Sequence, residues 1–305
     1  MYGEIAGILT TISFALSFVL ARRIQEEATP IFQSTIRALV GFITFFIICL
    51  SFGIILTISQ LPILLILILM MSILFTVILG DTAYLQSQKS LGPAKALAIG
   101  NTTPFFTILF ATLFLKRTFT ILMIFSGILI GIGAYIINKK DYNSQDFDKK
   151  STSSSRDTTY GLLWALFASV SWAIGLALSD YSIGQTNQIL GLGILGTVLA
   201  MMIRFLFASV VLIGISLIER RKKPIPKSRS TWKFLILSAI LSYALGSIFF
   251  GEAVYIVGAS FMALISTAMP LFTIPFSYLI NKESISRKGF IGVILTIFGV
   301  ILILI

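Results

Sequence analysis

Long apolar runs separated by short polar stretches dominate the chain, and this pattern predicts a bundle of membrane-spanning helices. A helix needs about 20 apolar residues to cross a bilayer, and the run from Leu61 to Leu79 approaches that length without a single charged residue. A segment surrounded by lipid must satisfy its own backbone hydrogen bonds, which favours helices. A membrane barrel would instead show segments of about ten residues with alternating polarity. We therefore expect an all-α, polytopic membrane protein.

Ten spans can be drawn along the 305 residues. They cover residues 4–21, 31–58, 63–87, 93–115, 119–137, 158–181, 190–218, 231–256, 258–280 and 288–305. A serine- and lysine-rich polar stretch separates the first five spans from the last five. This division predicts a five-helix repeat at 1–137, a polar linker loop at 138–159 and a second five-helix repeat at 160–305. The first segment lacks a basic leader and a small-residue cleavage site, so we expect it to be a span and not a signal peptide.

One stretch of the sequence occurs twice. Gly92 precedes Pro104 by twelve positions, and Gly258 precedes Pro270 by the same number. Phe-Thr-Ile follows both prolines, at 106–108 and at 272–274. Gly92 and Gly258 are 166 positions apart in the sequence, and we call this separation the repeat offset. An odd number of spans in each half means that the second half enters the membrane from the opposite face. The pattern therefore predicts two inverted-topology repeats, and interrupted helices in matched positions of such repeats indicate a transporter site.

Composition and charge agree with a membrane protein. Hydrophobic residues make up 57% of the chain and charged residues 11%, against roughly 25% charged residues in soluble domains. The net charge of +11 would suggest a nucleic-acid partner in a soluble protein. Here the basic residues cluster in short loops after the odd-numbered spans, while the opposite loops hold only Lys116 and Arg117. By the positive-inside bias we expect a multi-pass protein of the cell membrane with cytoplasmic odd-numbered loops, external termini and no nucleic-acid partner.

The two halves resemble the drug/metabolite transporter superfamily, and its EamA branch in particular. The resemblance rests on four features that follow one another in each half. They are an aromatic-rich third span, a small-residue stretch, a proline about twelve residues later, and an apolar run that ends in a polar turn. These features run from Gly80 through Pro104 to Lys116 and from Tyr255 through Pro270 to Glu283. The Lys-Arg turn of the first half departs from the family's usual Gly-Glu type. The resemblance implies a carrier of small metabolites such as amino acids, which exports or exchanges them by alternating access around a central cavity.

Ionisable residues inside the expected spans are the first candidates for a site. A charge at mid-bilayer costs about 2.5–3.5 kcal/mol on insertion scales and usually faces the bundle interior. Asp81, Tyr84 and Gln88 share one helical face, and Glu252 precedes Tyr255 by three positions in a similar arrangement. Both acids are candidates for a substrate amine or for proton coupling. The alternative is that they lie near span ends in interfacial water.

Two arginines and two prolines occupy matched positions in the halves. The separation of Arg37 and Arg204 equals the repeat offset to within one position, and a guanidinium suits carboxylate and phosphate groups. The alternative is a structural or lipid-headgroup role. Pro104 and Pro270 each remove a backbone hydrogen bond inside a span, which exposes polar groups to a ligand or only kinks the helix for packing. Two further residues complete the candidate substrate-binding set, namely Asn101 before the first proline and the aromatic Trp172.

The sequence argues against an enzyme. It contains no histidine, which removes histidine-ligated zinc sites and histidine-based triads, and it has no Walker-type nucleotide loop. We expect no cofactor and no catalytic or metal site. The predicted function is a secondary carrier of a small-molecule substrate, a monomer or homodimer in the lipid bilayer, with a cavity lined by spans 1, 3, 4, 6, 8 and 9. A passive channel and a non-transporting scaffold are the alternatives.

Overall fold

The computed structural model is helical throughout the part of the chain that it describes. That part comprises residues 2–24, 26–91, 96, 99–100, 102–104, 106–107, 110, 121–138, 155–219, 225–281, 291–292, 294–295, 298–299 and 302. Six of its helices are long and apolar enough to cross a membrane: 2–23, 30–51, 63–88, 159–190, 194–219 and 229–266. The all-α, membrane-spanning class is therefore confirmed. The fourth and tenth expected spans and the linker lie largely outside the described residues.

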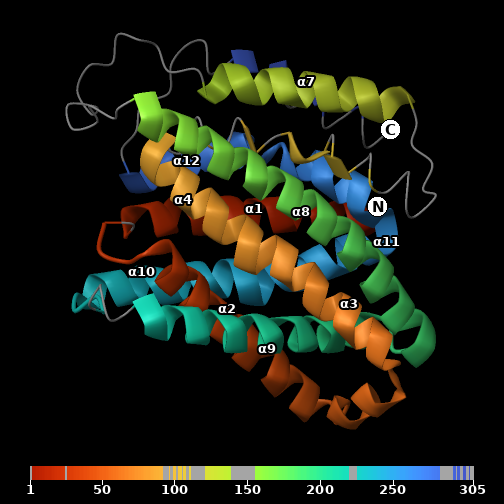
Figure 1. The fold of residues 1–305 in the computed structure, drawn as a ribbon. Helices are drawn as coiled ribbons and strands as arrows, with labels where there is room; N and C mark the ends of the chain where they lie inside the picture. Colours follow the sequence, from red (N-terminus) through yellow and green to blue (C-terminus); the bar gives the residue numbers. More distant parts are fainter. Residues whose placement is uncertain are drawn as a thin grey trace.

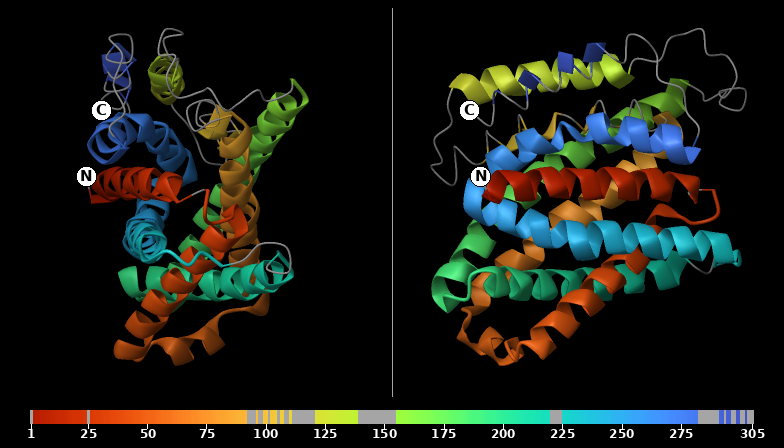
Figure 2. Two further views of the ribbon diagram at one scale, coloured as in Figure 1. Left: turned by 90° about the vertical axis from the view of Figure 1, so that its left-hand side faces the viewer. Right: turned by 180° about the vertical axis from the view of Figure 1, so that it is seen from behind.

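In order, the described helices are α1 (Tyr2–Arg23), α2 (Pro30–Ser51), the 3₁₀-helix η1 (Ile55–Gln60), α3 (Ile63–Ile73), the π-helix η2 (Leu74–Asp81), α4 (Thr82–Leu91), α7 (Ile121–Asn138), α8 (Ser155–Leu190), α9 (Ile194–Glu219), α10 (Arg229–Ala239), the π-helix η3 (Ile240–Gly246), α11 (Ser247–Ser266) and α12 (Met269–Asn281). In Figure 1, α1, α7 and α9 run nearly parallel to one another, and α3, α4 and α8 cross them obliquely. Seen from behind, α1 lies between α11 and α10 (Figure 2).

The two π-helices fall at matched positions of the sequence repeat. Leu74, the first residue of η2, and Ile240, the first residue of η3, are separated by the repeat offset. A π-helical segment makes a wider turn than an α-helix and often marks a functional site. Each one therefore changes which side chains its span presents to the centre of the bundle, at the same position in both halves.

A reversal of the chain separates the eighth and ninth expected spans. Gly258, inside α11, has φ 83° and ψ 167°, a conformation that is essentially restricted to glycine. The chain approaches Gly3 of α1 through Val257 and then returns past Gly7 through Met262 and Ile265. The junction expected between 256 and 258 is therefore a turn in the structure.

A buried acid supports the start of the returning helix. Asp180 of α8 accepts a hydrogen bond from the backbone N–H of Ala259, at 3.2 Å. The first N–H groups of a helix have no partner within the helix and are commonly satisfied by side-chain oxygens. Asp180 thereby ties α8 to the turn at Gly258.

The helix is interrupted by a turn just before each of the two repeated prolines. Thr102 N–H bonds to Ile99 O at 2.9 Å before Pro104. A turn at Thr267 and Ala268 separates α11 from α12, and Pro270 is the second residue of α12. Proline is well tolerated in the first turn of a helix, where its missing N–H has no partner to lose. The expected interruptions are present, but each lies ahead of its proline and not at it.

The expected end of the sixth span, at residue 181, is wrong, since α8 continues to Leu190. The extra turns are polar, and three of their side chains make hydrogen bonds within the bundle. Ser182 and Thr186 donate back to backbone carbonyls four positions earlier, and Asn187 Nδ2 bonds to Thr197 Oγ1 of α9 at 2.9 Å. Asn187 Oδ1 has no partner in the described part of the chain, but the other bonds allow the helix to extend beyond its apolar run.

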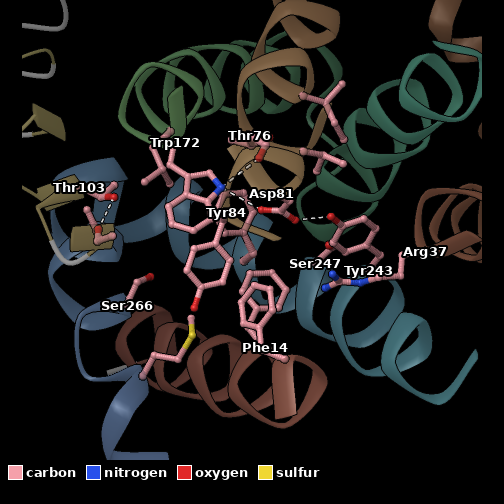
Figure 3. Close-up of a pocket in the computed structure, with 18 of the residues that line it drawn as sticks. Phe14, Arg37, Thr76, Asp81, Tyr84, Thr103, Trp172, Tyr243, Ser247 and Ser266 are labelled. Atoms are coloured by element: carbon pink, nitrogen blue, oxygen red, sulfur yellow. Dashed lines mark hydrogen bonds between the residues drawn. The ribbon is translucent and has the colours of Figure 1, made fainter. Parts of the chain in front are cut away.

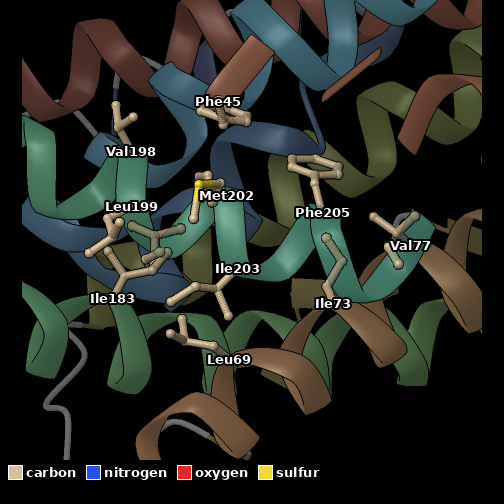
Figure 4. Packing of buried hydrophobic residues seen from close by; sticks show 14 of the residues in the cluster. Phe45, Leu69, Ile73, Val77, Ile183, Val198, Leu199, Met202, Ile203 and Phe205 are labelled. Carbon is tan, nitrogen blue, oxygen red and sulfur yellow. The ribbon is translucent and has the colours of Figure 1, made fainter. Parts of the chain in front are cut away.

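The main hydrophobic core lies where α2 and α9 pack together and meet α3 and α8 (Figure 4). Phe45 and Phe205 stack across the α2–α9 contact with ring centroids 5.7 Å apart and planes within 6°. Leu69, Ile73 and Ile183 fill the space toward α3 and α8. This core holds Arg37 of α2 and Arg204 of α9 at fixed positions near the centre of the bundle.

Candidate functional site

A cavity of about 140 Å³ lies in the middle of the bundle (Figure 3). The smallest cavity that holds one water has about 10–15 Å³ by the same measure, so this one has room for a small organic molecule. The six spans that were expected to line a cavity, numbers 1, 3, 4, 6, 8 and 9, all contribute to its wall. The lining residues include Phe14 and Phe18 of α1, Asp81 of η2, Thr103, Trp172 of α8, Phe250 of α11 and Ser266. The second and seventh spans also contribute, through Arg37 and Arg204.

Asp81 is the acidic centre of this cavity. Trp172 Nε1 donates a hydrogen bond to Asp81 Oδ1 at 2.8 Å and lies 3.1 Å from Thr76 O. The hydroxyl of Tyr243 donates to the other carboxylate oxygen. Asp81 keeps part of its surface accessible, whereas Tyr243 is buried. A carboxylate offers about four acceptor sites, so these two bonds leave capacity for another donor.

Arg37 lies behind Tyr243, away from the open part of the cavity (Figure 3). It is fully buried, and its guanidinium carbon stands 4.5 Å from the centroid of the Tyr243 ring. Arg37 Nη2 donates to Ser242 Oγ at 3.0 Å and to Ser17 Oγ at 3.3 Å. The arginine thus supports the tyrosine that bonds to Asp81.

Arg204 makes the matched contact in the other half. Its Nη2 donates to Thr76 Oγ1 at 3.3 Å, and Thr76 and Ser242 are separated by the repeat offset. Arg204 Nη1 approaches Met201 Sδ at 3.4 Å, and Nε has no partner. Each arginine therefore bonds to a hydroxyl on the π-helix of the other half, Arg37 to Ser242 on η3 and Arg204 to Thr76 on η2.

Two glycines on the π-helices make the same kind of matched contact. A Cβ at Gly80 would lie closer than 3 Å to Trp172 of α8, and a Cβ at Gly246 would lie 2.9 Å from Phe14 of α1. The repeat offset separates these glycines as well. The absence of a side chain lets an aromatic ring from the other half enter the cavity wall at each place.

The structure brings five of the predicted site residues together at the cavity: Asp81, Tyr84, Pro104, Trp172 and Arg204. The others lie elsewhere. Gln88 is buried one turn beyond Tyr84, which it contacts. Glu252 is only 6% exposed, with one carboxylate oxygen unpartnered, and Tyr255 is 39% exposed; neither lines the cavity. Asn101 lies outside the described residues, and of Pro270 only the backbone is described.

Sequence reasoning missed Tyr243 and Ser247, both of which line the cavity. Ser247 lines the cavity at the position that matches Asp81 in the register of the repeat. The similar Gly-acid-x-x-Tyr sequence around Glu252 does not keep the repeat offset and is not the structural counterpart of Asp81. Consistent use of the repeat offset would have found Ser247, but no local motif marks Tyr243.

Comparison with known proteins gives a consistent result. Residues 1–139 and 159–305 each match the model of the EamA-like transporter family. An uncharacterized transporter of Archaeoglobus fulgidus is 28% identical over 115 residues, which is 38% of this chain and 37% of that protein. An uncharacterized transporter of Clostridium kluyveri is 29% identical over 103 residues, 34% of this chain and 33% of that protein. The chain thus matches only about a third of the length of either relative.

A crystal structure of another protein has the same fold. It aligns with 98% of this chain and 95% of its own, with a TM-score of 0.74 at 14% sequence identity. At this identity the likeness concerns the fold alone. The family match, in contrast, covers nearly the whole sequence, including the stretches that contain Asp81, Trp172 and both arginines. The chain belongs to the EamA-like transporter family.

Proposed function

We propose that the protein is a secondary carrier that moves a small organic solute across the membrane by alternating access around the central cavity. The observation that carries this proposal is the position of the cavity. It lies in the middle of the bundle, and its wall includes residues beside both helix interruptions, Thr103 and Pro104 on one side and Ser266 and Thr267 on the other. Matched interruptions around a midplane site are typical of secondary transporters.

The proposed architecture is ten spans in two inverted five-helix repeats, 1–137 and 160–305, joined by the polar stretch 138–159. The matched contacts support it. Arg37 reaches Ser242 as Arg204 reaches Thr76, and the two π-helices are separated by the repeat offset. A pseudo-two-fold axis in the membrane plane relates such pairs, and the same frame can then open to either side.

The first solutes to test are amino acids and related organic compounds, as substrates of an exporter or exchanger. In reconstituted liposomes loaded with unlabelled solute, a carrier takes up labelled solute by counterflow and saturates with concentration. Flux that rises linearly without saturation would support the channel alternative. If no solute of a broad metabolite panel moves, the scaffold alternative is favoured.

Asp81 is the proposed proton-coupling group, with Glu252 as the second candidate. A carboxylate inside a membrane-spanning segment is a functional candidate by default, and Asp81 alone of the two lines the cavity. The charged and titratable groups that share the described cavity wall with Asp81 are Arg37 of α2, Tyr84 of α4, Arg204 of α9 and Tyr243 of η3. Asp81→Asn should abolish the pH dependence of flux, and Glu252→Gln should preserve it. Unchanged pH dependence in both variants would refute proton coupling through either acid.

A further inference from the structure

We infer that the transported solute is an organic anion with an apolar body, and that its carboxylate supplies the counter-charge that Arg204 lacks. This inference rests on the proposed carrier function and names the substrate class of the same cavity. Its basis is an imbalance of charge at the cavity wall. In the described part of that wall, two guanidinium groups stand against a single carboxylate, that of Asp81.

Arg204 is a buried charge without a counter-charge. It is 2% exposed, and it contacts a hydroxyl, a thioether and, at 5.7 Å, the ring of Phe250. Among the described residues no carboxylate pairs with it, and its Nε has no hydrogen-bond acceptor. Buried charges in proteins are normally paired, because removal from water is costly unless a partner compensates it. The cavity wall beside Arg204 therefore fits an anionic group.

Arg37 differs from Arg204 because Asp81 lies near it. The phenol of Tyr243 stands between them, with its ring against Arg37 and its hydroxyl on the Asp81 carboxylate. Arg37 Nη1, like Arg204 Nε, has no hydrogen-bond partner in the described part of the chain, so the two arginines differ in their acidic neighbour and not in this respect. Arg37 and Asp81 thus balance each other, and the remaining positive charge belongs to Arg204. One negative charge on the solute would make the occupied cavity neutral.

The surroundings of Arg204 define the rest of the solute. Thr76, which accepts from Arg204 and donates to Ser72 O at 3.0 Å, is partly accessible at the wall. Most of the remaining accessible wall is apolar or aromatic, including Phe14, Phe18 and Trp172. A guanidinium can hold a carboxylate with two parallel hydrogen bonds. We therefore place the carboxylate beside Arg204 and Thr76 and the apolar body among the aromatic rings.

An amine or an amino acid is a poorer match to this wall. Either one brings an ammonium group into a cavity that already has an excess of positive charge. Asp81 has acceptor capacity for that ammonium beside its bonds from Trp172 and Tyr243, but this pairing would leave Arg204 without a counter-charge and the cavity with a net positive charge. The order of affinity should therefore be carboxylate first, amino acid second and amine last, for molecules with the same apolar body.

The test uses four molecules that differ only in their polar end: 3-phenylpropionate, phenylalanine, 2-phenylethylamine and the uncharged 3-phenylpropanamide. Binding to the purified full-length protein is measured by calorimetry and by thermal shift, since a ligand of the folded state raises apparent stability. We expect 3-phenylpropionate to bind at least tenfold more tightly than the amine. Equal or tighter binding of the amine or the amino acid would overturn the inference, as would no binding by any of the four.

Variants at Arg204 locate the contact. Arg204→Gln should weaken 3-phenylpropionate binding at least tenfold and leave 3-phenylpropanamide binding unchanged, which also shows that the variant is folded. Arg204→Lys keeps the charge and should retain part of the affinity. An equal loss for acid and amide in Arg204→Gln would contradict the ionic contact. Saturable counterflow of the amine alone would overturn this inference but leave the carrier function intact, whereas absence of flux for every solute would remove both.

Discussion

Asp81 connects the two halves of the chain, because both of its side-chain donors, Trp172 and Tyr243, come from the second half. Trp172 also donates toward the backbone of Thr76, so the indole bridges two positions on η2. Hydrogen bonds to a charged group contribute about 1.5–3 kcal/mol each. The polar contacts of Asp81 thus help to hold the two halves together at the cavity.

The phenol of Tyr243 can be removed without removing its ring. In Tyr243→Phe the aromatic contact with Arg37 remains, while Asp81 loses one donor. We expect the free energy of unfolding to fall by about 1.5–3 kcal/mol, measured by thermal unfolding of the purified protein. Tyr255→Phe is the control, because Tyr255 is exposed and lies outside the cavity. Equal stability of the two variants would mean that the phenol bond contributes nothing.

Gly80 can be tested by adding a single methyl group. The new Cβ would overlap the Trp172 indole, and overpacking of this kind typically costs about 1–3 kcal/mol. Gly80→Ala should therefore lower the unfolding temperature and reduce flux. Gly214→Ala is the matched control, since nothing lies within 4 Å of a Cβ there, and alanine should slightly favour the helix. The prediction fails if both substitutions behave alike.

The sequence predicts the ionisable residues of the cavity better than its aromatic partners. Asp81 and Arg204 stand out because a charge within an apolar run needs a reason. Tyr243 does not stand out, because a tyrosine in a membrane helix is common at interfaces and in packing. Gln88 was misplaced by extending the face of Asp81 and Tyr84 with ideal α-helical geometry. The face does continue, but the cavity ends at Tyr84, and the sequence carries no sign of that limit.

At the scale of elements, wide turns and interruptions set the shape of the cavity. The π-helices η2 and η3 contribute Asp81 and Tyr243 to its wall from the two halves of the chain. The breaks at Thr102 and Thr267 place further hydroxyl groups beside it, those of Thr103 and Thr267 among them. Regular helices at all four places would present continuous apolar ridges instead.

The turn at Gly258 depends on its backbone conformation and on Asp180. At φ 83° and ψ 167° a side chain is strained, at a cost of about 1–3 kcal/mol. Gly258→Ala should lower the free energy of unfolding by that amount, as measured by thermal unfolding. Gly184→Ala, in open space on α8, should not. A Gly258→Ala protein as stable as the control would show that the turn adapts without strain.

The described spans of this fold were predicted closely, and their ends were not. Hydropathy marks where a segment meets lipid, so α2, α3 and α9 begin within a few residues of the expected positions. It does not register buried polar residues that satisfy one another, and for that reason the extension of α8 through Asn187 was missed. The π-helices leave no trace in hydropathy either, since they alter the turn and not the composition.

At the scale of the molecule, one end of the bundle is closed by contacts between the halves. Thr29 donates to Glu219 at 2.6 Å, and Thr231 donates to Glu27. Arg23 packs over the ring of Phe234 at the same end. The connection between α1 and α2 lies there beside the end of α9 and the start of α10 (Figure 2). In an alternating-access cycle these contacts must separate when the cavity opens to this end.

A reversible cross-link at this end tests that requirement. Thr29→Cys and Glu219→Cys, in a Cys49→Ala background, join the two halves through a short reagent with a reducible link. We expect the cross-link to abolish counterflow in liposomes and its reduction to restore it. The single-cysteine proteins treated with the same reagent are the controls. Full activity in the cross-linked protein would mean that this end does not open during transport.

The proposed orientation can be tested at the two ends of α9. Gln188 precedes this helix and Lys227 follows it, and both are exposed. The 26 residues of α9 span about 39 Å, so the two positions lie on opposite faces of the membrane. In intact cells a membrane-impermeant thiol reagent should label Gln188→Cys, and it should label Lys227→Cys only after permeabilisation. The reverse pattern would place the odd-numbered loops outside.

Asp81 and Ser247 occupy matched positions of the repeat, but only Asp81 can carry a proton on a carboxyl group. This difference limits the number of protons that a coupled transport cycle can move. Of the acidic residues in the described part of the chain, Asp81 alone lines the cavity, and the repeat places a hydroxyl at its counterpart. A cycle that uses this one acid moves one proton per turnover, whichever side the cavity faces. Under such a stoichiometry the accumulation ratio of the solute changes tenfold for each pH unit across the membrane, which is about 1.4 kcal/mol of driving force.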